Sequence, residues 1–154
     1  MTTKRVLTAA VLITVVSGMV LAQSTNPLVG TWTLNVAKSK APFKSGTTIV
    51  EPVGDGIRFI VDLVGTDGTK SHWEFTANYD GKEYPVTGNS PYGDTVVLTR
   101  VDPRTTRTVG KYRGKATVTH TIVVSPDGKT RTATAKGTDT AGKPVDSVSY
   151  YEKQ

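Results

Sequence analysis

The chain contains two histidines and no cysteine, so the histidines are the residues that could take part in the most kinds of chemistry, including metal binding and proton transfer. The alternation of apolar and polar residues predicts that His72 points out of its strand and that His120 points inward, between Val118 and Ile122. Neither histidine has a second histidine or a carboxylate at the short spacing of a zinc site, so we expect no metal. A histidine on an apolar face is usually a hydrogen-bonded core residue, and the alternative is a polar anchor inside a ligand cavity.

Catalytic motifs are absent from the sequence. It has no nucleophilic cysteine and no Gly-x-Ser-x-Gly elbow, and neither histidine has a serine and an aspartate arranged around it as in a catalytic triad. The Asp-Gly pairs lack the further ligands of a calcium-binding loop and are typical of hairpin turns. We therefore expect no catalytic residue, no enzymatic activity and no cofactor, although an acid–base pair assembled from distant strands would leave no local motif.

Aromatic side chains could form another kind of site, a cavity for a small apolar or amphipathic molecule. Such cavities are mostly apolar and hold a few well-placed polar groups. The strand pattern directs several aromatic residues to the same interior as His120, although these residues could also simply fill a solid core. The candidate ligand-binding residues are Phe59, Trp73, Phe75, Tyr79, Tyr112, His120 and Tyr150.

A basic stretch between residues 100 and 115 is a further candidate. Arg107, Lys111 and Arg113 share strand parity and could form an anion-binding surface, although a solvated strand face is the ordinary interpretation. Nucleic acid binding would need aromatic side chains between the charges, and only Tyr112 is present there. We expect no nucleic acid partner; envelope polysaccharide or anionic lipid headgroups would suit this surface better.

Strands must position these side chains. From Leu28 onward the sequence alternates with a period near two, is rich in β-branched and aromatic residues, and is interrupted regularly by turn residues. Short links predict an all-β antiparallel meander of eight to ten strands. Closure into an up-and-down barrel would remove both exposed edges, and we prefer it to the alternative of a two-sheet sandwich. The predicted strands cover residues 28–36, 46–52, 57–64, 70–79, 82–87, 94–101, 105–113, 115–124, 129–137 and 144–153.

The same alternation predicts which side chains face the interior. The inward sets are Ile57, Phe59, Val61 and Leu63; Trp73, Phe75, Ala77 and Tyr79; and Ala116, Val118, His120, Ile122 and Val124. Between residues 130 and 135, threonines alternate with Arg131, Ala133 and Ala135, so neither face of that strand is strongly hydrophobic. A partly polar interior would be wet enough to hold a ligand or ordered water.

The N-terminus has the features of a secretory signal. Lys4 and Arg5 precede an uncharged run from Val6 to Ala22, which ends in a small residue. We expect cleavage after Ala22, with residues 1–22 as a signal peptide and residues 23–154 as a single domain of 132 residues; a retained membrane anchor is the alternative. The protein would then be exported to the periplasm or the extracellular medium, with a net charge lowered from +6 to +4 and no disulfides.

Gly30, Thr31 and Trp32 stand in the first predicted strand. This tripeptide resembles the Gly-X-Trp signature of the calycins, the group that includes lipocalins, fatty-acid-binding proteins and avidins. In these barrels the tryptophan closes one end, and in many lipocalins a basic residue near the last strand packs across it. The resemblance therefore implies a barrel-end signature made of Gly30, Trp32 and Lys153.

Longer segments strengthen this similarity. Residues 32–39, 79–88 and 125–129 look like parts of small secreted bacterial proteins that are often described as lipocalin-like. The resemblance implies export and a barrel, and it implies no particular activity.

These observations favour an exported, soluble, lipocalin-like barrel that binds a small apolar or amphipathic molecule. We do not expect it to be membrane-embedded after signal cleavage, because the strands that carry Arg107 or Arg131 have no lipid-compatible face. The first alternative is a non-enzymatic structural or interaction module of the cell envelope, which would bind through the basic strand or an exposed sheet edge. The second is an enzyme with an acid–base pair in the cavity.

Overall fold

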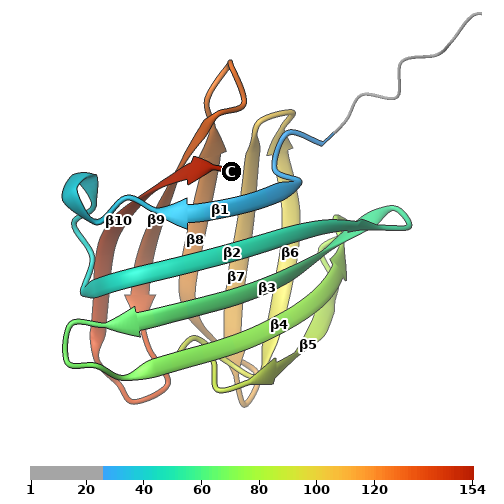
Figure 1. Cartoon of the computed structure of the whole chain (residues 1–154). Helices are drawn as coiled ribbons and strands as arrows, with labels where there is room; N and C mark the ends of the chain where they lie inside the picture. Colours follow the sequence, from blue (N-terminus) through green and yellow to red (C-terminus); the bar gives the residue numbers. More distant parts are fainter. Residues whose placement is uncertain (1–25) are drawn as a thin grey trace, which may run out of the picture.

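The computed structural model describes residues 26–154, so the expected signal peptide lies outside the described residues. Ten antiparallel strands follow one another in a meander and close into a single barrel, which confirms the predicted architecture over the two-sheet alternative (Figure 1). The strands are β1 (Gly30–Leu34), β2 (Phe43–Val53), β3 (Gly56–Gly65), β4 (Lys70–Asn78), β5 (Glu83–Gly88), β6 (Thr95–Asp102), β7 (Thr105–Tyr112), β8 (Lys115–Val124), β9 (Thr130–Thr138) and β10 (Pro144–Lys153).

Closure depends on the pairing of the first strand with the last. Thr33 of β1 lies opposite Glu152 of β10, and Asn35 donates a side-chain hydrogen bond of 2.8 Å to the Glu152 carboxylate. Figure 1 shows β2, β3 and β4 crossing in front of β7 to β10 at a steep angle, as strand tilt in a closed barrel requires. Because every strand pairs on both sides, the exposed sheet edge that the interaction-module alternative could use does not exist in the described barrel.

The link between β1 and β2 contains the single helical turn of residues 26–154, the 3-10 helix η1 (Val36–Lys38). Asn35 caps it by accepting a hydrogen bond from the Lys38 backbone N–H. The segment then pairs with the edge of β10 through an antiparallel bridge between Lys40 and Val148, and the Tyr150 backbone N–H donates to Ser39 Oγ at 2.9 Å. Within the described residues, no helix has the length and apolar character needed to cross a membrane.

Most of the predicted inward residues form the core, including Ile57 on β3, Ala77 on β4 and Val118 on β8, each with at most 1% of its surface exposed. Ala116 was predicted to face inward and is instead exposed. The pairing of β7 with β8 shifts register between Val109 and Lys111, and this irregularity breaks the alternation at the start of β8.

The inner face of β9 differs from all the others. Arg131, Ala133 and Ala135 point inward, while the intervening threonines point outward. Two of the three inward side chains are alanines, which are too small to fill the space in front of the strand. The barrel therefore keeps free volume beside β9, and Arg131, on the same face, is one of the residues that line it.

Candidate functional site

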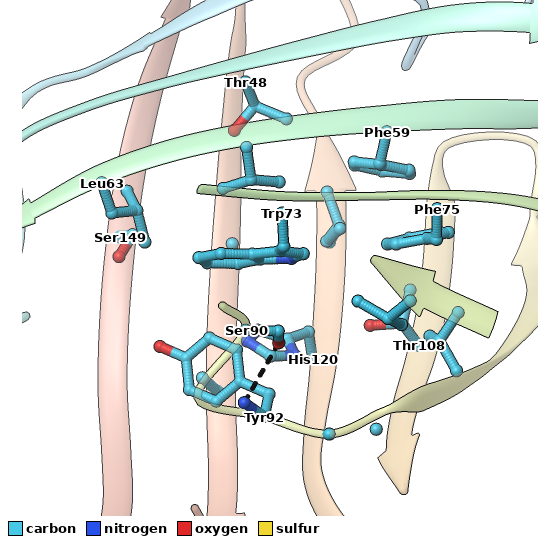
Figure 2. A pocket seen from close by; sticks show the side chains of 18 of the residues that line it. Thr48, Phe59, Leu63, Trp73, Phe75, Ser90, Tyr92, Thr108, His120 and Ser149 are labelled. Carbon is cyan, nitrogen blue, oxygen red and sulfur yellow. Dashed lines mark hydrogen bonds between the residues drawn. The ribbon is translucent and has the colours of Figure 1, made fainter. Parts of the chain in front are cut away.

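A cavity of about 100 Å³ lies inside the barrel. Figure 2 shows the Trp73 ring lying across its middle, with Thr48, Leu63 and Ser149 on one side and Tyr92 and His120 on the other. Phe59 and Phe75 stack beside it, with ring centroids 5.0 Å apart. The wall is completed by Phe43, Val61, Val86, Ser90, Gly93, Thr95, Val96, Thr108, Gly110, Ile122, Arg131, Ala133, Ala135, Ser147 and Tyr151.

Trp32 closes one end of the barrel. Its ring is completely buried, and its Nε1–H donates a hydrogen bond of 2.9 Å to the backbone carbonyl of Leu28, which is itself 2% exposed. The structure places Lys153 over this indole, with Nζ 5.1 Å from the ring centroid and 3.3 Å from the carbonyl oxygen of Pro27. The N-terminal segment is thus tied over the end of the barrel by the tryptophan and the lysine together.

A short strap between β5 and β6, residues 89–92, brings Tyr92 into the barrel. Gly88 and Gly93 flank the strap with φ of 97° and 148°, and a Cβ on Gly93 would lie 2.2 Å from the Lys111 carbonyl oxygen. The glycines therefore allow the strap to lie against the neighbouring strands. Its position is fixed by hydrogen bonds to the Tyr92 carbonyl from Thr117 Oγ1 and to the Pro91 carbonyl from the Thr140 N–H.

His120 faces the cavity, as the sequence predicted. Its ring meets the Tyr92 ring edge to face, with centroids 4.8 Å apart. Burial lowers the pKa of His120 from 6.5 to about 4, so the imidazole is neutral at pH 7. Burial also raises the pKa of Tyr92 to about 12, so both groups are uncharged.

Arg131 is the one charged side chain among the buried residues of the described chain, with 3% of its surface exposed. Its guanidinium carbon lies 5.0 Å from the centroid of Trp32 and 4.4 Å from that of Tyr151. Within residues 26–154, its Nε and Nη1 atoms have no hydrogen-bond partner, and no carboxylate forms an ion pair with it. Arg131 is therefore a buried cation with two unpartnered donors, and it is one of the residues that line the cavity.

The energetic balance of Arg131 is unfavourable without a counter-charge. Burial lowers its pKa from 12.5 to about 10, which corresponds to a penalty on the order of 3 kcal/mol against the charged form. A desolvated cation–π contact contributes roughly 2 kcal/mol, so the aromatic rings offset part of the several kcal/mol that burial of an ion costs. Because the pKa stays far above 7, the guanidinium remains charged under ordinary conditions.

Hydroxyl groups extend the polar part of the cavity beyond Arg131. Burial raises the pKa of Tyr151, and this effect is opposed by the charge of Arg131 and by hydrogen bonds with Ser149, Thr48 and Arg131. Thr48 and Ser149 are 2% and 6% exposed. The cavity thus has a polar side around Tyr151 and an aromatic side around Trp73.

Three of the predicted cavity residues lie outside its lining. Tyr79 follows the end of β4, accepts a hydrogen bond of 2.8 Å from Asn26 Nδ2, and lies beneath Arg100. Tyr112 contacts a shallow surface hollow beside the strap, at the end of β7. Tyr150 is 39% exposed, because Ser147, Ser149 and Tyr151 form the inner face of β10. Phe59, Trp73, Phe75 and His120 are brought together as expected.

Arg107, Lys111 and Arg113 do not form the continuous basic surface that their shared strand parity predicted. Arg107 is exposed on β7, and Lys111 forms an ion pair with Glu83. Arg113 belongs to the turn after β7, with φ of 50°, and its guanidinium carbon lies 5.1 Å from the centroid of Tyr112. Anion binding by these three residues stays a prediction.

Sequence reasoning missed Arg131 as a site residue. The signal that could have identified it was its shared parity with Ala133 and Ala135, since an arginine among alanines on an inward face has no ordinary role in a packed core. No aspartate or glutamate is among the described residues that line the cavity. Among residues 26–154, no three histidine or acidic side chains gather closely enough to hold a metal ion.

The chain was compared with known proteins. No protein-family model matches it. No curated protein matches it either.

Proposed function

We propose that this protein is an exported carrier or sensor of the lipocalin-like type, which binds a small amphipathic molecule inside its barrel. The observation that carries the proposal is the cavity itself, which has an aromatic side at Trp73 and a polar side at Tyr151. Ligand-binding cavities combine an apolar wall with a few polar groups in this way. The Gly30-Thr31-Trp32 start and the closed meander support the calycin type, and residues 1–22 support export.

The volume limits the ligand. An apolar cavity of roughly 150 Å³ holds a benzene-sized molecule in a well-studied protein, and this cavity of about 100 Å³ is smaller. A short-chain or small cyclic compound fits these dimensions, whereas a long acyl chain would need the strap and Tyr92 to move out of the barrel. The proposal therefore concerns molecules with an apolar part of a few carbon atoms.

Native mass spectrometry of the protein purified from its own host tests both parts of the proposal. We expect a reproducible added mass that is lost on denaturation, on a polypeptide that begins at Gln23. A polypeptide that still carries residues 1–22 would contradict export by signal cleavage.

A cavity-filling variant shows whether binding takes place inside the barrel. Ala135 lines the cavity and is 4% exposed, while Ala116 is exposed on a neighbouring strand. We expect neutral butanol to shift the NMR signals of Trp73 and His120 in the wild type and in Ala116→Leu, and not in Ala135→Leu. Circular dichroism checks that both variants are folded. Equal binding by all three proteins, or no binding of butanol and of other small neutral probes to the wild type, would overturn the proposal.

A further inference from the structure

Arg131 indicates which chemical class of ligand the cavity binds. This inference rests on the proposed function. Its guanidinium is buried at one side of the cavity, with Nε and Nη1 unpartnered among the described residues. Both atoms carry N–H groups of a planar cation that pairs strongly with carboxylates, and because the Nε–H and Nη1–H groups point in different directions, each would donate to a separate acceptor atom. A side chain that served only to close the barrel would leave both donors without a purpose.

The charge of the cavity also indicates an anionic ligand. The described lining contains one arginine, no aspartate and no glutamate, and burial keeps His120 neutral. The cavity is therefore positively charged while it holds no anion. A neutral or cationic ligand would leave that charge uncompensated, whereas an anion would neutralise it in surroundings of low polarity, where a charge-assisted hydrogen bond is strong.

The neighbours of Arg131 suit a carboxylate. Tyr151 lies directly against the guanidinium, and its hydroxyl interacts with Thr48 and Ser149. These hydroxyl groups can donate to an anion or accept from its hydrogen-bonding partners. Trp73, Phe59 and Phe75 line the remaining wall and would surround an apolar tail.

We propose that the barrel binds a small organic acid, with its carboxylate against the guanidinium of Arg131 and its short apolar tail against Trp73. The tail is limited by the cavity of about 100 Å³ to a few carbon atoms. Arg131 thus acts as the specificity-determining residue, and the aromatic side supplies the general affinity for apolar groups.

Matched probes test the inference without knowledge of the natural ligand. Butyrate, butyramide and butanol have tails of similar size and differ in charge, and they are titrated at pH 7 in a buffer whose only anion is a bulky sulfonate. We expect butyrate to bind the wild type at least about tenfold more tightly than butyramide, because its contact with the guanidinium is charge-assisted. The Arg131 Nε–H signal in the NMR spectrum should shift with butyrate and not with butanol.

Arg131→Gln is the decisive variant, since it keeps a polar side chain and removes the charge. We expect it to lose the preference for butyrate while it still binds butanol. Should this variant not fold, the comparison of butyrate with butyramide and the Arg131 Nε–H signal, both measured on the wild type, still decide the question. Lys129→Gln removes an exposed charge and should leave binding unchanged.

The remaining outcomes separate the two proposals. If butyramide and butanol bind as tightly as butyrate, the proposed preference for an organic acid is contradicted. The proposal that the cavity binds a small molecule is then retained. If chloride or inorganic phosphate binds as tightly as butyrate and displaces it, Arg131 holds an inorganic ion, and the organic acid is overturned. If none of the probes binds, the proposed function itself fails, and the inference fails with it.

Discussion

Tyr92 and His120 meet edge to face inside the barrel, with ring centroids 4.8 Å apart, although one belongs to a strap and the other to β8. The contact encloses the imidazole between the strap and the inner wall. It explains why a histidine tolerates an apolar interior: the ring is held neutral by burial and packs as an aromatic group.

This packing predicts a loss of stability in mild acid. The pKa of His120 is about 4 in the folded protein and about 6.5 in the unfolded chain. Between these values the unfolded chain binds a proton that the folded protein does not, so the free energy of unfolding falls as the pH is lowered from about 6.5 to about 4. The full effect is on the order of 3 kcal/mol and can be measured by urea denaturation.

The control for this prediction is His120→Gln, which should remove most of the dependence above about pH 5. His72→Gln should retain it, because His72 is exposed and paired with Asp62 at 2.7 Å. Carboxylates with lowered pKa, such as Asp80 and Asp127, lose their stabilising contribution from about pH 5 downward, so the part of the window above pH 5 reports on His120. A pH profile of His120→Gln that matches the wild type would contradict the explanation.

The strap should depend strongly on Gly93. A methyl group there would meet the Lys111 carbonyl oxygen at 2.2 Å, in a backbone conformation that L residues rarely adopt. We expect Gly93→Ala to lower the free energy of unfolding by about 3 kcal/mol, the combined cost of strain and overpacking. Gly128→Ala is the matched control, since its φ of 71° is also positive but nothing lies within 4 Å of the added Cβ. It should cost about 1 kcal/mol, and an equal loss in both variants would show that close approach is unimportant.

Trp32 should stabilise the barrel far more than the lysine above it. Trp32→Phe removes the hydrogen bond to the Leu28 carbonyl and leaves space in a fully buried position, so we expect a loss of about 2 kcal/mol. Lys153→Met should cost at most about 1 kcal/mol, the usual value of an exposed cation–π contact. Denaturation curves compare them, with Lys129→Met as the exposed control. A lysine variant as unstable as Trp32→Phe would mean that Lys153 is essential for closing the barrel.

Tyr92 should set the upper limit on ligand size. Its ring occupies one end of the cavity, between Trp73 and His120. Tyr92→Ala would extend the free volume, and we expect the affinity for hexanoate relative to butyrate to rise about tenfold, since each added methylene that becomes buried contributes roughly 0.8 kcal/mol. Titrations of both acids against both proteins provide the measurement. Unchanged selectivity would place the tail of the ligand elsewhere.

The sequence by itself determined the strands and much of the interior. The turn residues and the period of two located all ten strands to within a few residues, and alternation alone brought Phe59, Trp73, Phe75 and His120 to one cavity. These features depend on local rules, because a turn requires particular backbone angles and successive side chains in a strand point to opposite faces.

Tertiary structure decided the features that depend on how strands pair. The register shift between Val109 and Lys111 turned Ala116 outward. The segment after β1 pairs with the edge of β10, whose inner face contains Ser149 and Tyr151 instead of Tyr150. The prediction that Tyr150 lines the cavity was therefore wrong. Arg131 became a candidate binding group only because closure placed it against Trp32 and Tyr151, with no carboxylate of the described chain beside it. Such relations join residues far apart in the sequence, and local patterns carry no information about the charge that a cavity will enclose.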